Sequence, residues 1–176
     1  MIRENRLSDR RGVAALEFAL LAPLFMMMLI GGVDFADAYM AKSILDATLS
    51  SASNYALLNT AMAPATLASN LTAIIANSSG VVFDGSVVVN NGNTSTVTGG
   101  MTSNGGSANT NCYCPSGTPP TLTWGMPVAC GTVCPGSGIA GNFVSMNATY
   151  SYVPILTGYA WVPSGTLSAS AVVQTK

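Results

Sequence analysis

Three residues near the N-terminus could take part in chemistry: Gly12, Val13 and Glu17. Gly12 lies between a basic leader and an apolar run that begins at Val13, and Glu17 is the only charged side chain over residues 12–33. Cleavage after Gly12 would give Val13 a free α-amino group and make Glu17 the fifth residue of the product. Residues four apart are neighbours on a helix, so the new ammonium and the carboxylate would compensate each other.

The apolar run that carries these residues is long enough to cross a membrane. As a helix, residues 12–33 would extend ~33 Å, at about 1.5 Å per residue, which spans the hydrocarbon layer. A carboxylate costs about 2.5–3.5 kcal/mol at the bilayer centre and less near an interface, so Glu17 is expected to have a role. Four of the six basic residues precede the run. The positive-inside rule therefore places the N-terminus in the cytoplasm and the residues after about 34 outside.

The same stretch resembles the start of TadE-like minor pilins, which belong to the tight-adherence (Tad) pilus systems of bacteria. The residues that carry the resemblance are RGVAALEFALLAPL at 11–24 and Gly32-Val33-Asp34-Phe35, with looser similarity at 148–154 and 167–173. The middle of the chain is not covered. The resemblance implies a class III signal, in which a prepilin peptidase cuts between Gly12 and Val13. It also implies that Glu17 helps to align subunits.

The resemblance further implies the function, the partners and the location. The chain is expected to be a minor pilin or pseudopilin that takes part in assembly of a Tad-type adhesive pilus. Its partners would be the prepilin peptidase, other pilin and minor-pilin subunits that pack on the apolar helix, and the inner-membrane assembly platform. It would cross the bacterial inner membrane once, with a cytoplasmic N-terminus and an extracytoplasmic C-terminal domain, and could enter a surface pilus.

Two other interpretations of the N-terminus stay open. A secretory signal peptide would be cut after the small-x-small triplet Ala36-Asp37-Ala38. An uncut anchor would instead present a surface domain that binds a carbohydrate or a protein through its Asn/Ser/Thr-rich loops. The apolar run exceeds the usual 7–15 residues of a secretory signal, and the helical pattern continues through the alternative cut, which favours prepilin-type processing.

The periodicity of the chain predicts an α+β fold. We expect a leader at 1–12, a transmembrane helix at 13–34, an extracytoplasmic continuation of that helix at 35–60, and a small domain at 61–176. The continuation should bury one face, made of Phe35, Tyr39, Leu45, Leu49, Ala52 and Ala56. Pro23 should kink the helix, because proline removes a backbone hydrogen bond.

The small domain should combine a short helix with an antiparallel sheet. Leu67, Leu71, Ile74 and Ile75 predict the helix, and 77–80 should end it. Strands are expected at 81–89, with a bulge or turn at Asp84-Gly85, at 144–152, at 159–162 and at 167–173. Eighteen of the twenty-one residues at 91–111 are Asn, Gly, Ser or Thr. That segment is expected to be a flexible loop, since it has little apolar surface to bury.

Four cysteines on the outward side predict two disulfides. In the sequence they lie in two groups, Cys112 near Cys114 and Cys130 near Cys134, within Pro- and Gly-rich segments. Zinc is the competing interpretation, because four thiolates can make a structural site, but the Cys-x-Cys spacing suits it poorly. Sequence leaves three connectivities open. Bridges between the two pairs are favoured, because a bridge within Cys-x-Cys would close a strained ring.

The composition argues against catalysis and against nucleic acid as a partner. The chain has no histidine, which excludes Ser-His-Asp and Cys-His catalysis and imidazole metal sites. Asp84 and Lys176 are the only Asp, Glu, Lys or Arg residues after Asp46, so paired carboxylates and basic patches are lacking. Asp34, Asp37 and Asp46 are expected on solvated helix surface. We therefore expect no enzyme activity, no catalytic residues, no metal and no cofactor.

Overall fold

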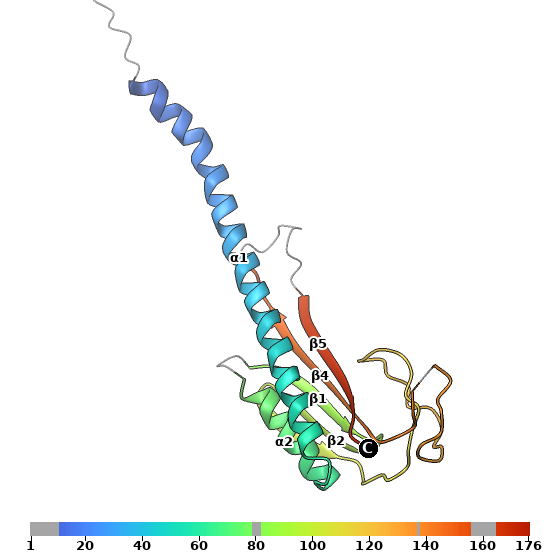
Figure 1. The fold of residues 1–176 in the computed structure, drawn as a ribbon. Coiled ribbons are helices and arrows are strands. Elements are labelled where there is room, and N and C mark those ends of the chain that lie inside the picture. Colours follow the sequence, from blue (N-terminus) through green and yellow to red (C-terminus); the bar gives the residue numbers. More distant parts are fainter. Residues whose placement is uncertain (1–10, 79–81, 137, 156–164) are drawn as a thin grey trace, which may run out of the picture.

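One helix, α1 (Arg11–Leu58), runs the length of the molecule, and a small head packs on its second half (Figure 1). The computed structural model describes residues 11–78, 82–136, 138–155 and 165–176. The other elements are α2 (Pro64–Ala76), β1 (Asp84–Val89), β2 (Asn93–Thr98), β3 (Met101–Gly105), β4 (Phe143–Tyr152) and β5 (Gly165–Gln174). The predicted α+β class, with a long apolar N-terminal helix, is confirmed.

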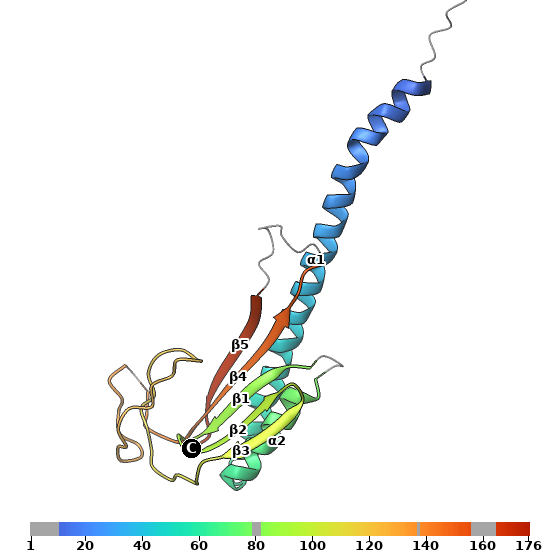
Figure 2. The ribbon, with the colours of Figure 1, turned by 180° about the vertical axis from the view of Figure 1, so that it is seen from behind.

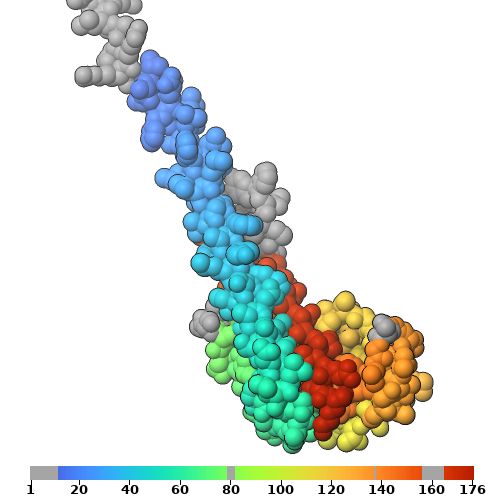
Figure 3. Space-filling model, in the orientation of Figure 1, coloured from blue at the N-terminus to red at the C-terminus, as the bar shows by residue number. Residues whose placement is uncertain are grey.

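The two halves of α1 have different surroundings. The N-terminal half extends beyond the head (Figure 3), and its most apolar stretch is not buried within the chain. It is long and apolar enough to cross a membrane, and the helix continues through Pro23. In the C-terminal half, Leu45, Leu49, Ala52 and Ala56 are buried as predicted.

The head has two layers, with the helices on one face of the sheet (Figure 2). The five strands are antiparallel in the order β3-β2-β1-β4-β5. The predicted alternation along β4 is confirmed, since Val144, Met146 and Ala148 are buried. The core between the layers is formed by Leu45, Leu49, Leu67, Leu71, Ile75, Phe83, Val87, Val97, Val144 and Met146. Helix and sheet therefore share one apolar core.

Residues 91–111 are not the flexible loop that their composition predicts. They contain β2 and β3, which pair with register Val87↔Ser95 and Thr96↔Ser103. The backbone ladder joins β2 to β1 and β3 to β2, and β2 buries Ser95 and Val97 on the core side. Positive φ angles at Asn90 and Asn91 and at Gly99 and Gly100 form the two connecting turns. Backbone hydrogen bonding to an apolar neighbour strand compensates for the missing apolar side chains.

Two further predictions about local structure are wrong. Phe35 and Tyr39 are exposed, because ten residues of helix turn Phe35 about 80° away from Leu45. The strand pairing passes through Gly85 without a bulge or turn. A Cβ at Gly85 would lie 2.9 Å from Ile75 Cγ2 and 3.0 Å from the Asn147 oxygen, so this glycine permits α2 to approach the sheet. The strand predicted at 159–162 lies outside the described residues.

The packing of the core predicts that substitution of two helix leucines by alanine will have very different effects on the free energy of unfolding. Leu71 is fully buried, whereas Leu58 at the end of α1 is 84% exposed. Leu71→Ala should lower the free energy of unfolding by about 2–5 kcal/mol, because it removes apolar contacts and leaves a cavity. Leu58→Ala should change it by less than about 0.5 kcal/mol. Chemical denaturation in detergent measures both, and equal effects would contradict this core.

Candidate functional site: the apolar helix and its junction with the sheet

The predicted processing residues lie at the free end of α1. The bond between Gly12 and Val13 is in the first turn, because the helix begins at Arg11, and Gly12, Val13 and Glu17 are all exposed. A Cβ at Gly12 would meet no described atom of the chain within 4 Å. The fold of the chain therefore gives no packing reason for glycine at this position.

The free half of α1 carries apolar side chains on all sides. The exposed large residues include Val13, Leu16, Phe18, Leu20, Leu21, Leu24, Phe25, Met26, Met27, Met28, Leu29 and Val33. A helix that is apolar all round needs apolar surroundings, which lipid or other apolar helices supply. This half of α1 fits a membrane anchor.

Asp34 joins the outer end of this apolar half to the sheet. It is only 3% exposed. The Ile155 backbone N–H donates to Asp34 Oδ1 at 2.8 Å, and the Tyr152 hydroxyl donates to the Asp34 carbonyl oxygen at 2.7 Å, with Oδ1 3.3 Å away. These contacts connect residues more than one hundred positions apart. We call Asp34, Tyr152 and Ile155 the Asp34 junction.

The prediction that Asp34 lies on solvated helix surface is wrong. Asp34, Ala41 and Leu45 are seven and four residues apart, so they share the helix face that meets the sheet. Asp37 and Asp46 are exposed as predicted, and Asp46 accepts a 2.9 Å hydrogen bond from Lys42. Sequence reasoning missed the role of Asp34, although its position on the same face as Leu45 was a usable signal.

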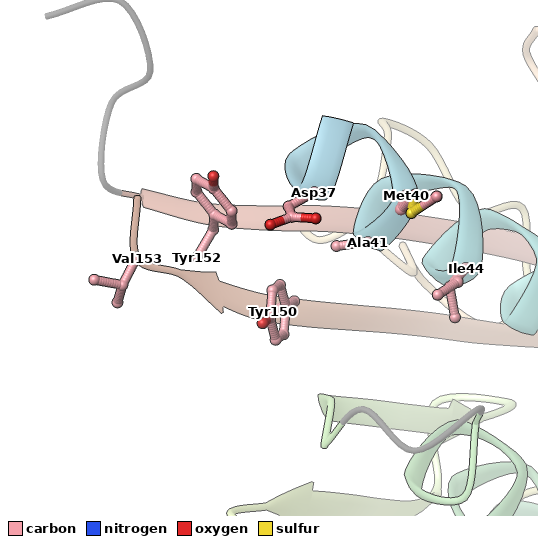
Figure 4. A pocket seen from close by; sticks show the side chains of 7 residues that line it. All are labelled: Asp37, Met40, Ala41, Ile44, Tyr150, Tyr152 and Val153. Atoms are coloured by element: carbon pink, nitrogen blue, oxygen red, sulfur yellow. The ribbon is translucent and has the colours of Figure 1, made fainter. Parts of the chain in front are cut away.

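A pocket of about 300 Å³ lies beside the junction, between α1 and the end of β4 (Figure 4). It is lined by Asp37, Met40, Ala41, Ile44, Tyr150, Tyr152 and Val153. Burial and then the negative charge of Asp34 raise the pKa of Tyr152. The hydroxyl is therefore held in its neutral form, in which it can donate to Asp34.

A separate lobe between β3 and β4 is held by two disulfides. They join Cys112 to Cys130 and Cys114 to Cys134, so each bridge connects the two sequence pairs. This agrees with the favoured pairing and differs from the zinc alternative. No group of three His, Cys, Asp or Glu side chains suited to a metal occurs among the described residues.

The lobe also contains a small aromatic cluster. The Tyr113 ring is buried and meets Trp124 edge to face, with ring centroids 5.8 Å apart. Asn109 Nδ2 lies 2.6 Å from the Tyr113 hydroxyl, and this hydrogen bond lowers the Tyr113 pKa. The disulfides and this cluster order a segment that buries few apolar side chains.

One comparison with known proteins matches most of α1. The family model described as TadE-like protein matches residues 12–53. The match begins at the predicted cleavage glycine and includes Glu17 and Asp34. No curated protein and no solved structure matches the chain. The resemblance of the N-terminal region to TadE-like proteins is confirmed.

The Asp34 junction predicts a pH dependence of stability. Unfolded tyrosine ionises at a pKa of about 10, whereas folding raises the pKa of Tyr152. The unfolded state therefore loses this proton first, so stability falls as the pH rises above about 10 and is unaffected by Tyr152 well below it. The slope is at most about 1.4 kcal/mol per pH unit.

Unfolding measured across this pH range tests the prediction, with Tyr152→Phe as the comparison. The fall should be shallower in Tyr152→Phe, because the group with the raised pKa is gone. Tyr113→Phe is the matched control: because the Tyr113 pKa is lowered, this variant should lose a rise in stability just below pH 10 and keep the fall above pH 10. An unchanged slope in Tyr152→Phe would contradict the assignment.

Proposed function

Since residues 12–53 match the TadE-like family, which is associated with Tad pilus systems, we propose that this chain is a minor pilin or pseudopilin of such a system. A prepilin peptidase cuts it between Gly12 and Val13, and the mature helix then takes part in assembly of the pilus. The observation that carries the proposal is the matched apolar helix, which projects from the head with Glu17 near its free end. The role is structural and not enzymatic.

The uncovered helix surface supports assembly through helix packing. In the inner membrane, lipid covers the apolar side chains of residues 13–33. In an assembly, the helices of other pilin and minor-pilin subunits take the place of that lipid. Packing between membrane helices depends on van der Waals contact and polar pairing, since lipid tails are as apolar as the side chains. The four arginines of the leader keep the N-terminus in the cytoplasm, where the platform and the peptidase meet it.

Glu17 gives this packing a polar contact. A carboxylate within an apolar segment is costly unless a cation pairs with it. The proposed cation is the α-amino group of Val13, of the same chain or of a neighbouring subunit, and it exists only after cleavage. Cleavage would then permit assembly. The competing interpretation is that Glu17 extends to the cytoplasmic headgroups and has no role in packing.

Gly12→Leu should block processing, because a bulky side chain would prevent the scissile bond from entering the peptidase. Co-expression with the cognate peptidase, followed by mass spectrometry of the N-terminus, measures this. The natural chain should begin at Val13 and the variant at Met1. A natural chain that begins at Met1 would support an uncut anchor instead, and one that begins at Tyr39 would support a secretory signal.

Glu17→Ala should be cleaved after Gly12 but should assemble less well. The substitution makes the segment more apolar, so insertion is retained, but it removes the partner of the new amine. Cross-linking and co-purification with other pilin-like subunits should fall several-fold. Leu16→Ala, at an exposed neighbouring position, is the matched control and should keep most of the cross-linking. Wild-type assembly by a correctly cleaved Glu17→Ala protein would exclude the amine–carboxylate pair.

A further inference from the structure

We propose that the head makes a second contact with the membrane, through the segment that follows β4. The contacting side chains are Val153 and Ile155, which we call the β4 tip, and the partner is the outer surface of the lipid bilayer. The inference depends on the proposed placement of residues 13–34 in the membrane. The new element is that the head contacts the bilayer surface directly, in addition to its attachment through α1.

The Asp34 junction sets the height of the β4 tip. A hydrocarbon layer of about 30 Å is spanned by about 20 residues of helix, so a span that begins at Val13 reaches its outer boundary near Asp34. The Ile155 N–H lies 2.8 Å from Asp34 Oδ1. The tip is therefore held beside the point at which α1 leaves the membrane.

The pairing of the strands places the β4 tip beyond the ends of β1, β2 and β3, toward the N-terminal end of α1. The register of β1 against β4 ends at Thr149, whereas β4 continues to Tyr152 with only β5 beside it. In Figure 1, β4 and β5 reach farther toward the N-terminal end of α1 than the other strands do. No other strand of the described sheet comes as close to the proposed membrane boundary.

The side chains at the tip suit a bilayer surface. Val153 is 73% exposed and Ile155 is 65% exposed, whereas the alternating residues Tyr152 and Pro154 are buried. Phe35 and Tyr39 are exposed on the first turns of α1 beyond Asp34. Aromatic and aliphatic residues of this kind are favoured at membrane interfaces. The charged groups near the tip are on α1: Asp34 is already buried at the junction, and Asp37 is exposed beside the same pocket as Val153. Between Asp84 and Lys176 the sequence adds no acidic or basic side chain.

Lipid is a better occupant of this surface than a protein. Stable protein interfaces bury about 800 Å² on each partner, and two aliphatic side chains provide much less. The surface continues directly into the apolar half of α1, which needs lipid around it in any case. The proposed anchor already places the surface of the bilayer beside the β4 tip.

Fluorescent labels at three single introduced cysteines test the proposal in the full chain, reconstituted in phosphatidylcholine–phosphatidylglycerol nanodiscs with nitroxide lipids. The sites are Leu24→Cys in the proposed span, Ile155→Cys at the tip, and Leu58→Cys at the far end of α1. All three side chains are exposed in the chain. Nitroxides near the headgroup should quench the label at 155 and leave that at 58 bright, and deep nitroxides should quench the label at 24.

The outcomes separate this proposal from the proposed function. An unquenched label at 24 would overturn the membrane anchor and both proposals. A quenched label at 24 with an unquenched label at 155 would overturn only the tip contact, as would equal quenching at 155 and 58.

Variants at Asp34 test how the tip is held. Asp34→Ala removes the acceptor of the Ile155 N–H and should reduce quenching at 155 without changing it at 24. Asp34→Asn keeps an acceptor oxygen and should retain the quenching. If Asp34→Ala does not fold, the quenching of the three labels in the natural chain still decides whether the tip contacts the bilayer. Quenching at 155 in Asp34→Asn can then be compared with that in the natural chain. Full quenching at 155 in a folded Asp34→Ala protein would show that the junction does not position the tip.

Discussion

The hydrogen bonds between Asp34 and the end of β4 decide how this molecule is arranged. A buried carboxylate is costly unless donors satisfy it, and here the donors come from Tyr152 and Ile155, far away in the sequence. The contact marks a boundary along α1. Before Asp34 the most apolar stretch of the helix is not buried within the chain, and after it the helix packs on the sheet. The direction of the head relative to the anchor is therefore fixed where the helix changes surroundings.

One continuous helix thus serves two environments. Residues 13–33 are apolar on every side, which suits lipid or other helices, whereas the following residues bury a single face against α2 and the sheet. A break between the halves would separate the anchor from the head. The unbroken backbone, together with the Asp34 junction, transmits the orientation of one half to the other. The family match covers both sides of this boundary, from 12 to 53.

The head reaches order with almost no charge. Its sheet combines an apolar center in β1 and β4 with polar strands, β2 and β3, that are added by backbone pairing. Two disulfides hold the lobe between β3 and β4. The stability of the head therefore depends on hydrogen bonds and disulfides and little on ion pairs. Among the described residues, Lys42–Asp46 is the ion pair found. The stability of the head should therefore depend weakly on salt.

The sequence by itself determined the features that depend on local periodicity and composition. The long helix, its apolar half, the short helix and the alternation in β4 and β5 all follow from residue types at fixed spacing. Cysteine spacing favoured bridges between the two pairs, but which cysteine joins which was decided by the tertiary structure. Tertiary structure decided the rest. Polar residues 93–105 became strands because β1 offered a backbone ladder, and Asp34 became buried because β4 ends beside it. β1 is adjacent to β2 in the sequence, but the polar composition of 93–105 hid the pairing. The partners of Asp34 are more than one hundred residues away, so the helix sequence could indicate which face Asp34 shares but not what it contacts.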